Sequence, residues 1–215
     1  MGEPLGQIYS ALWQEIATLH FHWGEYVELF GNKPARITLL NDAAPFFFRM
    51  IQDGLLEMSV LHLARLTDAP VSRGRNERTN LTIRSLPNLI AEPEFKATVA
   101  TLINEAIAAT DFCRDWRNRH IAHRDLKLAL DQPTTPLAEG SRAAVKKALD
   151  ALGAVLNALA GHYFKSETRF DLGAPRGGSA SLLYVLSEGV RAQEAREKRP
   201  EEGRPAKEDF VFRDL

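Results

Sequence analysis

Cysteine is almost absent from this sequence, since Cys113 is the only one in 215 residues. An intramolecular disulfide is therefore impossible, and a metal site built from several cysteines is excluded. Glu-x-x-His pairs of the kind that hold two metal ions in helical bundles are also missing, so we expect no bound metal and no cofactor. The cysteine usage is compatible with a reducing compartment, and we expect a cytoplasmic protein.

Long apolar runs are absent as well. No stretch approaches the ~18 consecutive apolar residues of a membrane-spanning helix, and no signal-peptide pattern is visible. We therefore expect no membrane association. The sequence also has no excess of one charge, because 27 basic residues balance 28 acidic ones and leave a net charge of −1. The global charge thus gives no indication of a polyanionic partner.

Basic residues are nevertheless concentrated in two segments. Between residues 114 and 127, five basic side chains accompany two acidic ones, and between residues 71 and 88, four arginines accompany one glutamate. Two interpretations are open: the segments form one surface for an anionic ligand, or they are two separate solvated faces.

Glycine and proline are missing between Glu94 and Asp131. Apolar residues recur there every three or four positions, which predicts one long helix, and a kink near Thr110 is compatible with the pattern. Gly31 ends a predicted N-terminal helix, Pro45 is tolerated in the first turn of the next, and Ser141 is a candidate helix cap. The same spacing predicts further helices over residues 8–30, 41–66, 145–163 and 181–199.

The segments between these helices contain no alternation typical of strands. Residues 71–92 form a long connection with a short helix predicted at 81–86. Residues 131–140 form a Pro/Thr-rich loop, and residues 173–178 form a break that contains three glycines. We therefore predict an all-α fold. Its expected parts are a helical domain over residues 1–170 and, over residues 171–215, a C-terminal helix and charged tail that pack on or extend the same domain.

The most informative segment runs from Asp115 to Asp125 and reads Asp-Trp-Arg-Asn-Arg-His-Ile-Ala-His-Arg-Asp. Within it, Asn118 directly follows Arg117, and His123 lies six positions after Arg117. Arginine offers a fixed fork of donors for phosphate oxygens. Histidine is the side chain most readily poised as an acid or base near neutral pH. The pair indicates phosphodiester chemistry without a metal.

This Arg-x(5)-His spacing and its surroundings resemble the abortive-infection (Abi-type) branch of the HEPN superfamily of helical ribonucleases. The resemblance covers roughly residues 10–165, and it includes Leu63–Asp68 and Asn80–Ile83 upstream of the motif. It implies a HEPN-like antiparallel helical bundle with an extra C-terminal helix. It also implies a two-fold homodimer in which the motifs of both protomers line a shared cleft.

The resemblance further implies roles for the residues of the motif. His123 is expected to be the general base that deprotonates a ribose 2′-OH, and Arg117 is expected to hold the scissile phosphate. Asn118 is expected to orient one or the other, and the partner subunit's His123 to protonate the leaving oxygen. Substrate-binding roles are expected for Arg114, Arg119, His120 and Arg124.

Helical geometry constrains such a site. Six positions correspond to about 600°, so Arg117 and His123 lie roughly 120° apart around an ideal helix. They converge only if the helix distorts or if a partner helix supplies the other half, which favours a site shared within a dimer. His120 lies on the same side as His123 and is the alternative base. In a simpler interpretation, Arg117 pairs with Asp111 or Asp115, and His123 is a satisfied interior histidine.

Two residues upstream also allow two interpretations. In the first, Arg65 reaches the cleft and Asp68 positions an arginine of the motif. In the second, the two residues form an ion pair at the end of their helix, before Pro70. We favour the second on sequence alone.

Two functions from different classes follow. The resemblance favours a metal-independent endoribonuclease used in phage defence or as a toxin, restrained by an antitoxin protein. Its substrate would be single-stranded or looped RNA, whose bases and 2′-OH are accessible. The alternative is a non-catalytic helical dimer that binds RNA, a nucleotide or another protein through the same cleft.

Overall fold

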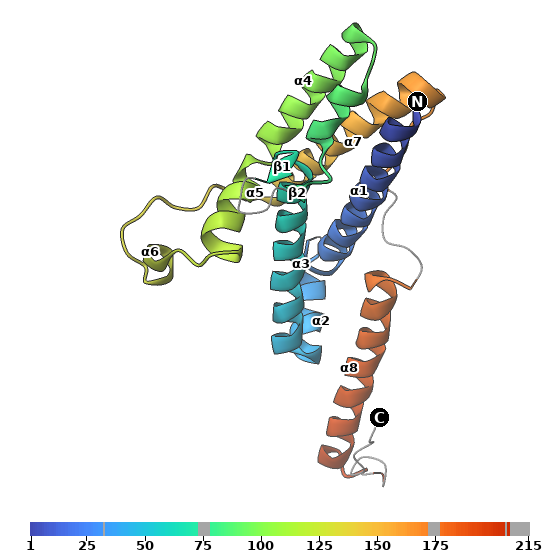
Figure 1. The fold of residues 1–215 in the computed structure, drawn as a ribbon. Coiled ribbons are helices and arrows are strands. Elements are labelled where there is room, and N and C mark those ends of the chain that lie inside the picture. The colour runs from blue at the N-terminus through green and yellow to red at the C-terminus, as the bar shows by residue number, and fades with distance from the viewer. Residues whose placement is uncertain (32, 73–77, 172–176, 205, 207–215) are drawn as a thin grey trace. The chain divides into compact units, whose positions relative to one another are not determined.

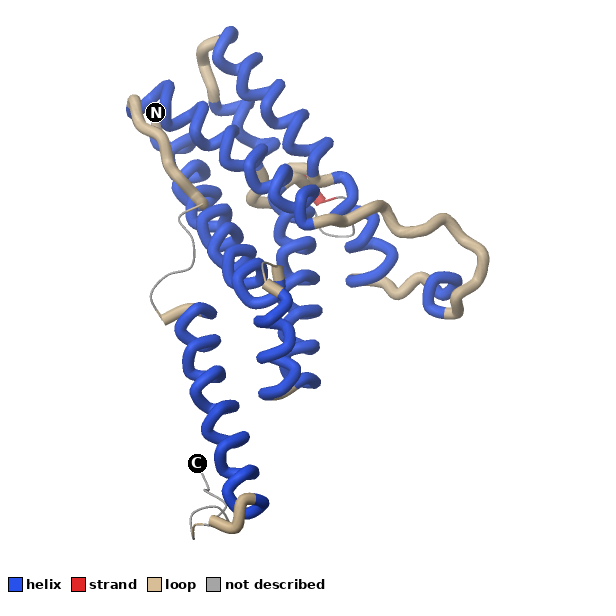
Figure 2. The backbone as a smooth tube through the Cα atoms, turned by 180° about the vertical axis from the view of Figure 1, so that it is seen from behind, coloured by secondary structure: helices blue, strands red, loops and turns tan. Residues whose placement is uncertain are grey.

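A computed structural model describes the chain except for residues 32, 73–77, 172–176, 205 and 207–215. The regular structure of the described part is helical apart from one short hairpin, which confirms the all-α prediction (Figure 1, Figure 2). Its contacts divide the chain into two compact units. Unit 1 comprises residues 1–23 and 55–172, and unit 2 comprises residues 24–54 and 173–215. None of the helices in the described part is both long and apolar enough to span a bilayer.

Unit 1 holds most of the apolar core. Its helices α4 (Pro93–Ala109) and α7 (Arg142–Phe164) lie side by side in both views (Figure 1, Figure 2). Helix α1 (Glu3–Phe30) contributes an apolar stripe in which Leu12 and Ile16 are fully buried. The three- and four-residue spacing places these side chains on one face, and burial of that face stabilises the helix.

Unit 2 contains α2 (Pro34–Ala43) and α8 (Ser179–Glu201), which contact each other. The Glu25 carboxylate accepts a hydrogen bond of 2.6 Å from the Ser179 N–H at the first turn of α8. An anionic group is favourable at this position because helix N-termini carry unpaired N–H groups. The buried core of this unit consists of Leu29, Leu40, Phe48 and Leu183.

Several predictions for the C-terminal half are confirmed. Ser141 caps α7, since its Oγ accepts from the Ala144 N–H at 3.1 Å. Residues 131–140 form an irregular loop. The last helix covers the predicted range and extends two residues beyond it at each end. Most of the predicted break at 173–178 lies outside the described residues.

The segment before Pro45 differs from the prediction of one helix from residue 41. The helix begins at Pro45 as α3 (Pro45–Leu66), and α2 precedes it as a separate helix. Ala44 separates the two with φ −164° and ψ 77°. The ring of a proline crowds the preceding residue out of the α region, which explains the break.

The connection over residues 71–92 also differs from the prediction. Strand β1 (Val71–Ser72) pairs antiparallel with β2 (Arg78–Thr79). The prediction that this connection contains no strand was therefore wrong. Strands of two residues are too short to show a period of two. The short helix predicted at 81–86 is a 3₁₀-helix, η1 (Ile83–Leu89), whose start is capped by Thr82.

The single long helix predicted over residues 94–131 was wrong, although the kink near Thr110 is confirmed. Thr110 (φ −99°, ψ 6°) separates α4 from α5 (Asp111–Trp116), and a π-helix, η2 (Arg117–Ile121), follows. Asp125 then leaves the α region (φ −55°, ψ 121°) and caps a four-residue helix, α6 (Leu126–Ala129). A side-chain cap of this kind starts a new helix even where no glycine or proline ends the old one.

Leu152→Ala is expected to lower the free energy of unfolding by about 2–5 kcal/mol, because Leu152 is fully buried in α7 and its truncation leaves a cavity. Leu126→Ala is the matched control. Leu126 is 70% exposed, so the same truncation should change stability by less than about 0.5 kcal/mol. Urea unfolding followed by circular dichroism measures both, and equal effects would contradict the burial of Leu152.

Candidate functional site

The motif lies where the register of helical hydrogen bonding changes. In η2 the Ala122 N–H donates to the Arg117 carbonyl, five residues back, at 2.8 Å. The Asp125 N–H then donates to the Arg119 carbonyl at 3.0 Å. Single π-turns of this kind are frequent at functional sites. Arg117 therefore opens the widened turn, and His123 lies just beyond it.

The guanidinium group of Arg117 is held by two neighbours. Its Nη1 donates to Asp68 Oδ2 at 2.6 Å, and its Nε donates to Asn118 Oδ1 at 3.1 Å. Its Nη2 makes no hydrogen bond within the part of the chain that is described. The side chain is 27% exposed and therefore accessible to a ligand. Its ion-pair partner is neither Asp111 nor Asp115, so the simpler interpretation of the sequence was wrong on this point.

A pair of buried hydroxyl groups includes Thr67, which directly precedes Asp68 in the sequence. Thr67 and Thr110 are both fully buried, and their Oγ1 atoms form a hydrogen bond of 2.9 Å. Arg114 adds to the cluster, with Nη1 donating to Thr67 Oγ1 at 3.0 Å. Arg114 Nη2 donates to the Ile107 carbonyl at 2.8 Å and to Asp111 at 3.2 Å. These contacts give Arg114 a structural role, and its predicted substrate contact stays a prediction.

The turn that carries Asp68 is also held by the connection after α3. The Thr82 hydroxyl is fully buried and lies 2.9 Å from the carbonyl oxygens of both Leu66 and Asp68. Asn80 Nδ2 donates to the Ala69 carbonyl at 2.8 Å. Because buried polar groups with complete partners make a structure rigid, Asp68 lies on a fixed support.

Arg119 ties the loop after the motif to the motif itself. Its guanidinium group contacts the carboxylates of Asp115 at 3.3 Å and Asp125 at 3.6 Å. It also donates to the carbonyl groups of Thr135 and Pro136. Arg119 therefore has a structural role as well, and the substrate contact predicted for it stays a prediction.

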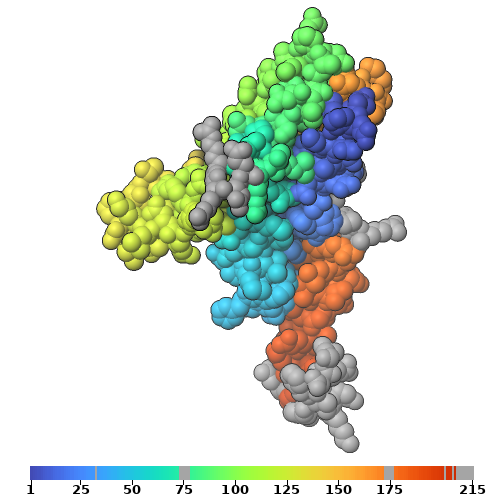
Figure 3. Space-filling view, viewed as in Figure 1, coloured from blue at the N-terminus to red at the C-terminus, as the bar shows by residue number. Residues whose placement is uncertain are grey.

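The remaining motif residues are accessible. Asn118, His123 and Arg124 are exposed, and the yellow-green stretch of chain that contains them reaches the surface in Figure 3. With respect to the described residues, His123 and Arg124 make no side-chain hydrogen bond or ion pair. His120 is half-buried, with its ring 5.9 Å from that of Trp116. The structure thus joins Arg117 to Asn118 and leaves His123 open to solvent, not in the interior.

Arg65 does not pair with Asp68, so the interpretation favoured on sequence alone was wrong. Arg65 and His62 both contact Glu15 of α1, with 2.7 Å between His62 Nε2 and Glu15 Oε2. Burial, and then the positive charge of Arg65, lower the pKa of His62. Asp68 instead contacts an arginine of the motif.

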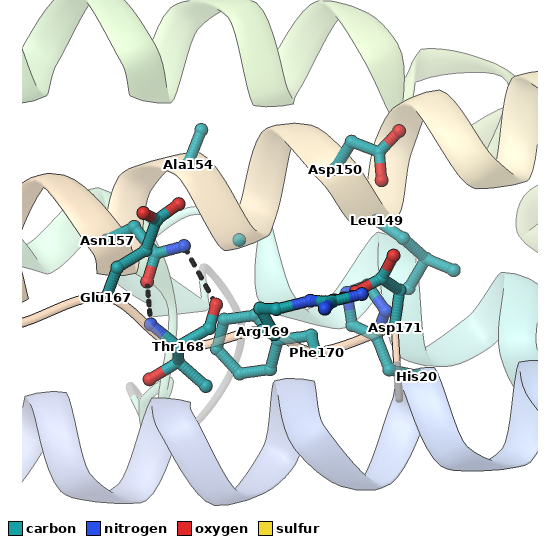
Figure 4. A pocket seen from close by; sticks show the side chains of 11 residues that line it. His20, Leu149, Asp150, Ala154, Asn157, Glu167, Thr168, Arg169, Phe170 and Asp171 are labelled. Atoms are coloured by element: carbon teal, nitrogen blue, oxygen red, sulfur yellow. Dashed lines mark hydrogen bonds and ion pairs between the residues drawn. The ribbon is translucent and has the colours of Figure 1, made fainter. Parts of the chain in front are cut away.

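A pocket of about 500 Å³ lies elsewhere in unit 1 (Figure 4). Asn157 of α7 fixes its wall, because it donates to the Thr168 carbonyl at 3.0 Å and accepts from the Thr168 N–H at 2.9 Å. Phe170 stacks on His20 with 5.2 Å between the rings, and burial lowers the pKa of His20. None of the predicted site residues lines this pocket, so it is separate from the motif.

Cys113 is not a candidate nucleophile. It is fully buried, and burial raises the pKa of its thiol to about 12, which leaves no thiolate near neutral pH. In the described ranges, no three His, Cys, Asp or Glu side chains are grouped so that they could hold a metal ion. The candidate site therefore consists of arginine, asparagine, histidine and aspartate side chains.

Thr67→Val is expected to lower the free energy of unfolding by about 1–3 kcal/mol, because it removes the buried hydroxyl bonded to Arg114 and Thr110 but keeps the side-chain shape. Thr101→Val is the matched control. The Thr101 hydroxyl also donates to a helix carbonyl, at 3.1 Å, but the residue is exposed and water replaces the bond. Thermal unfolding measures both variants, and equal stability would contradict the role of the Thr67 cluster.

Stability is expected to fall as the pH drops below about 6.5, with a contribution from His62. Because the folded state lowers the pKa of His62, the unfolded chain binds the proton more readily below that pH. Above it neither state is protonated, so the effect vanishes. His62→Gln keeps a donor for Glu15 without titrating. Between about pH 7.5 and pH 5.5 the parent should lose more stability than this variant in urea unfolding, and an equal loss would contradict the assignment.

Comparison with known proteins identifies the family. A family model described as HEPN_AbiU2 (AbiU2) matches residues 2–179, a range that contains the whole candidate site. No curated protein and no solved structure shows a significant match. The match agrees with the motif and with the all-α fold. The chain belongs to the AbiU2 family, an abortive-infection type of HEPN domain.

Proposed function

We propose that this protein is a metal-independent endoribonuclease of the HEPN type, which acts in the cytoplasm in phage defence or as a toxin. One arrangement supports the proposal more than any other. Arg117 is anchored through Nη1 and Nε at the π-turn, Asn118 contacts it, and His123 is exposed two residues beyond the turn. Membership of an abortive-infection HEPN family agrees with this role.

The chemistry needs these side chains, the RNA and a second histidine that protonates the leaving 5′-oxygen. His123 takes the proton from a ribose 2′-OH, and the oxygen attacks the adjacent phosphorus. The bond between phosphorus and the 5′-oxygen breaks, which leaves a 2′,3′-cyclic phosphate and a 5′-OH. Arg117 stabilises the negative charge that develops on the equatorial oxygens, where fixed donors are most effective. Asn118 keeps the guanidinium group oriented through its contact with Nε.

A second copy of the chain completes the proposed site. Arg117 is held towards Asp68, whereas the His123 side chain makes no hydrogen bond or ion pair with the described part of its own chain. In a two-fold dimer, the partner subunit's His123 protonates the leaving 5′-oxygen. The exposed Arg124 is then available for the RNA backbone, and its charge suits a phosphate. Single-stranded or looped RNA is the expected substrate, and an antitoxin protein is the expected restraint.

Pure protein incubated with mixed cellular RNA in EDTA is expected to produce fragments with 2′,3′-cyclic phosphate and 5′-OH ends. Arg117→Ala and His123→Ala should each slow cleavage by about 10²–10⁴-fold, because each removes a positioned group that acts in the transition state. His120 is the alternative base. If His123 is the base, His120→Ala should slow cleavage less than His123→Ala does. Mass spectrometry of the product ends measures the chemistry.

Arg49→Ala is the matched control, because Arg49 is an exposed arginine of α3 that pairs with Asp53 outside the motif. It should cut at the parent rate. Light scattering should give twice the 24.0 kDa of one chain for the parent and the variants. Equal cleavage by the parent and His123→Ala would contradict the assigned base. Absence of cleavage by the parent would favour the alternative, a non-catalytic helical dimer that binds RNA, a nucleotide or a partner protein.

A further inference from the structure

One residue at the candidate site has no place in the proposed chemistry, yet it makes the shortest ion pair there. Asp68 Oδ2 lies 2.6 Å from Arg117 Nη1, although the two residues are 49 positions apart in the sequence. Both side chains are largely covered, with 30% and 27% exposed. An ion pair of this kind differs from exposed pairs on a single helix, such as Arg49–Asp53, which contribute little to stability.

Asp68 is itself held in place on both sides. Thr82 lies within hydrogen-bond distance of its carbonyl oxygen, at 2.9 Å. The preceding residue, Thr67, forms hydrogen bonds with Thr110 and with Arg114 of α5. A carboxylate on such a support keeps a fixed position relative to η2. Rigid support from neighbouring hydrogen bonds is what holds a functional side chain in its productive geometry.

The contacts of Arg117 leave a defined part of its guanidinium group available. Asp68 binds Nη1 and Asn118 binds Nε, so the plane of the group is fixed by two hydrogen bonds. Nη2 makes no hydrogen bond to the described residues, and its two N–H donors can bind phosphate oxygens. An arginine that is already oriented loses less rotamer freedom when it binds.

From this geometry we infer that Asp68 is the positioning residue of the site, which holds the Arg117 guanidinium group in the orientation that binds the scissile phosphate. The inference rests on the proposed ribonuclease function. The charge of Asp68 argues against a role in affinity, because a carboxylate next to a phosphate site repels the substrate. Its benefit must therefore appear in the transition state, where the orientation of Arg117 matters most.

This reasoning predicts an unusual kinetic signature. Asp68→Ala should lower kcat by about 10–100-fold, because a displaced guanidinium group no longer matches the transition state. KM should stay the same or fall, since the repulsion of the substrate is removed. Asp68→Asn should retain part of the activity, because its amide oxygen can still accept from Nη1. In an Arg117→Ala background, Asp68→Ala should have no further effect on kcat, since the residue acts through Arg117.

Glu15→Ala is the matched control. Glu15 of α1 forms an ion pair with Arg65 of α3, so this substitution also removes a carboxylate that pairs with an arginine of α3. The arginine concerned is Arg65 and not Arg117. It should leave kcat and KM at the parent values. A readout that does not depend on cleavage is the ¹⁵N–¹H signal of Arg117 Nη1, the group that Asp68 binds, assigned through its loss in Arg117→Ala. The parent and Glu15→Ala should show a resolved, slowly exchanging signal, and Asp68→Ala should show fast exchange.

The outcomes separate the inference from the function on which it rests. A fall in kcat without a rise in KM, with no added effect in the Arg117→Ala background, supports positioning by Asp68. Parent-like kinetics of Asp68→Ala, an additive double variant or an unchanged Nη1 signal would overturn the inference while leaving the ribonuclease intact. Absence of cleavage by the parent overturns the proposed function instead. The Nη1 signal then decides alone whether Asp68 orders Arg117.

Discussion

The hydrogen bond between the buried hydroxyl groups of Thr67 and Thr110 is the contact on which the candidate site depends. It joins the end of α3 to the break between α4 and α5, two places that are distant in the sequence. Arg114 extends the same cluster towards the motif. Both hydroxyls are fully buried, and each is also within hydrogen-bond distance of a carbonyl group of its own helix, so the polar groups of the junction have partners, which makes the junction rigid.

Around this junction, segments that are distant in the sequence meet. Residues 63–68 and 80–83 resembled the Abi-type HEPN branch together with the motif, and the structure explains why they occur together. Thr82 holds the turn after α3, that turn presents Asp68, and Asp68 contacts Arg117. The segments that carry the family resemblance therefore form one physical cluster, which ends at the arginine of the motif.

The helices that depend on local signals were predictable. The apolar spacing of α7 and its Ser141 cap are readable from the sequence, because both are decided within a few residues. The π-turn was not, since nothing between Glu94 and Asp131 breaks a helix by composition. There the cap at Asp125 competes with continuation of the helix. The separation of α2 from α3 was missed for a similar reason: Pro45 permits a helix start and also forces Ala44 out of the α region.

By itself the sequence determined the helical class and the presence of a single cysteine, and it predicted Arg117, Asn118 and His123 as the candidate site. The first two follow from composition and periodicity, which do not depend on contacts. The third rests on side-chain type and on the resemblance to the HEPN superfamily. Only the tertiary structure decided how each charge is used. Arg114 and Arg119 are bound within the chain, and Arg117 is paired with Asp68 but remains accessible. An arginine can satisfy its donors with any nearby acceptor, and which acceptors are near is set by the packing of distant segments.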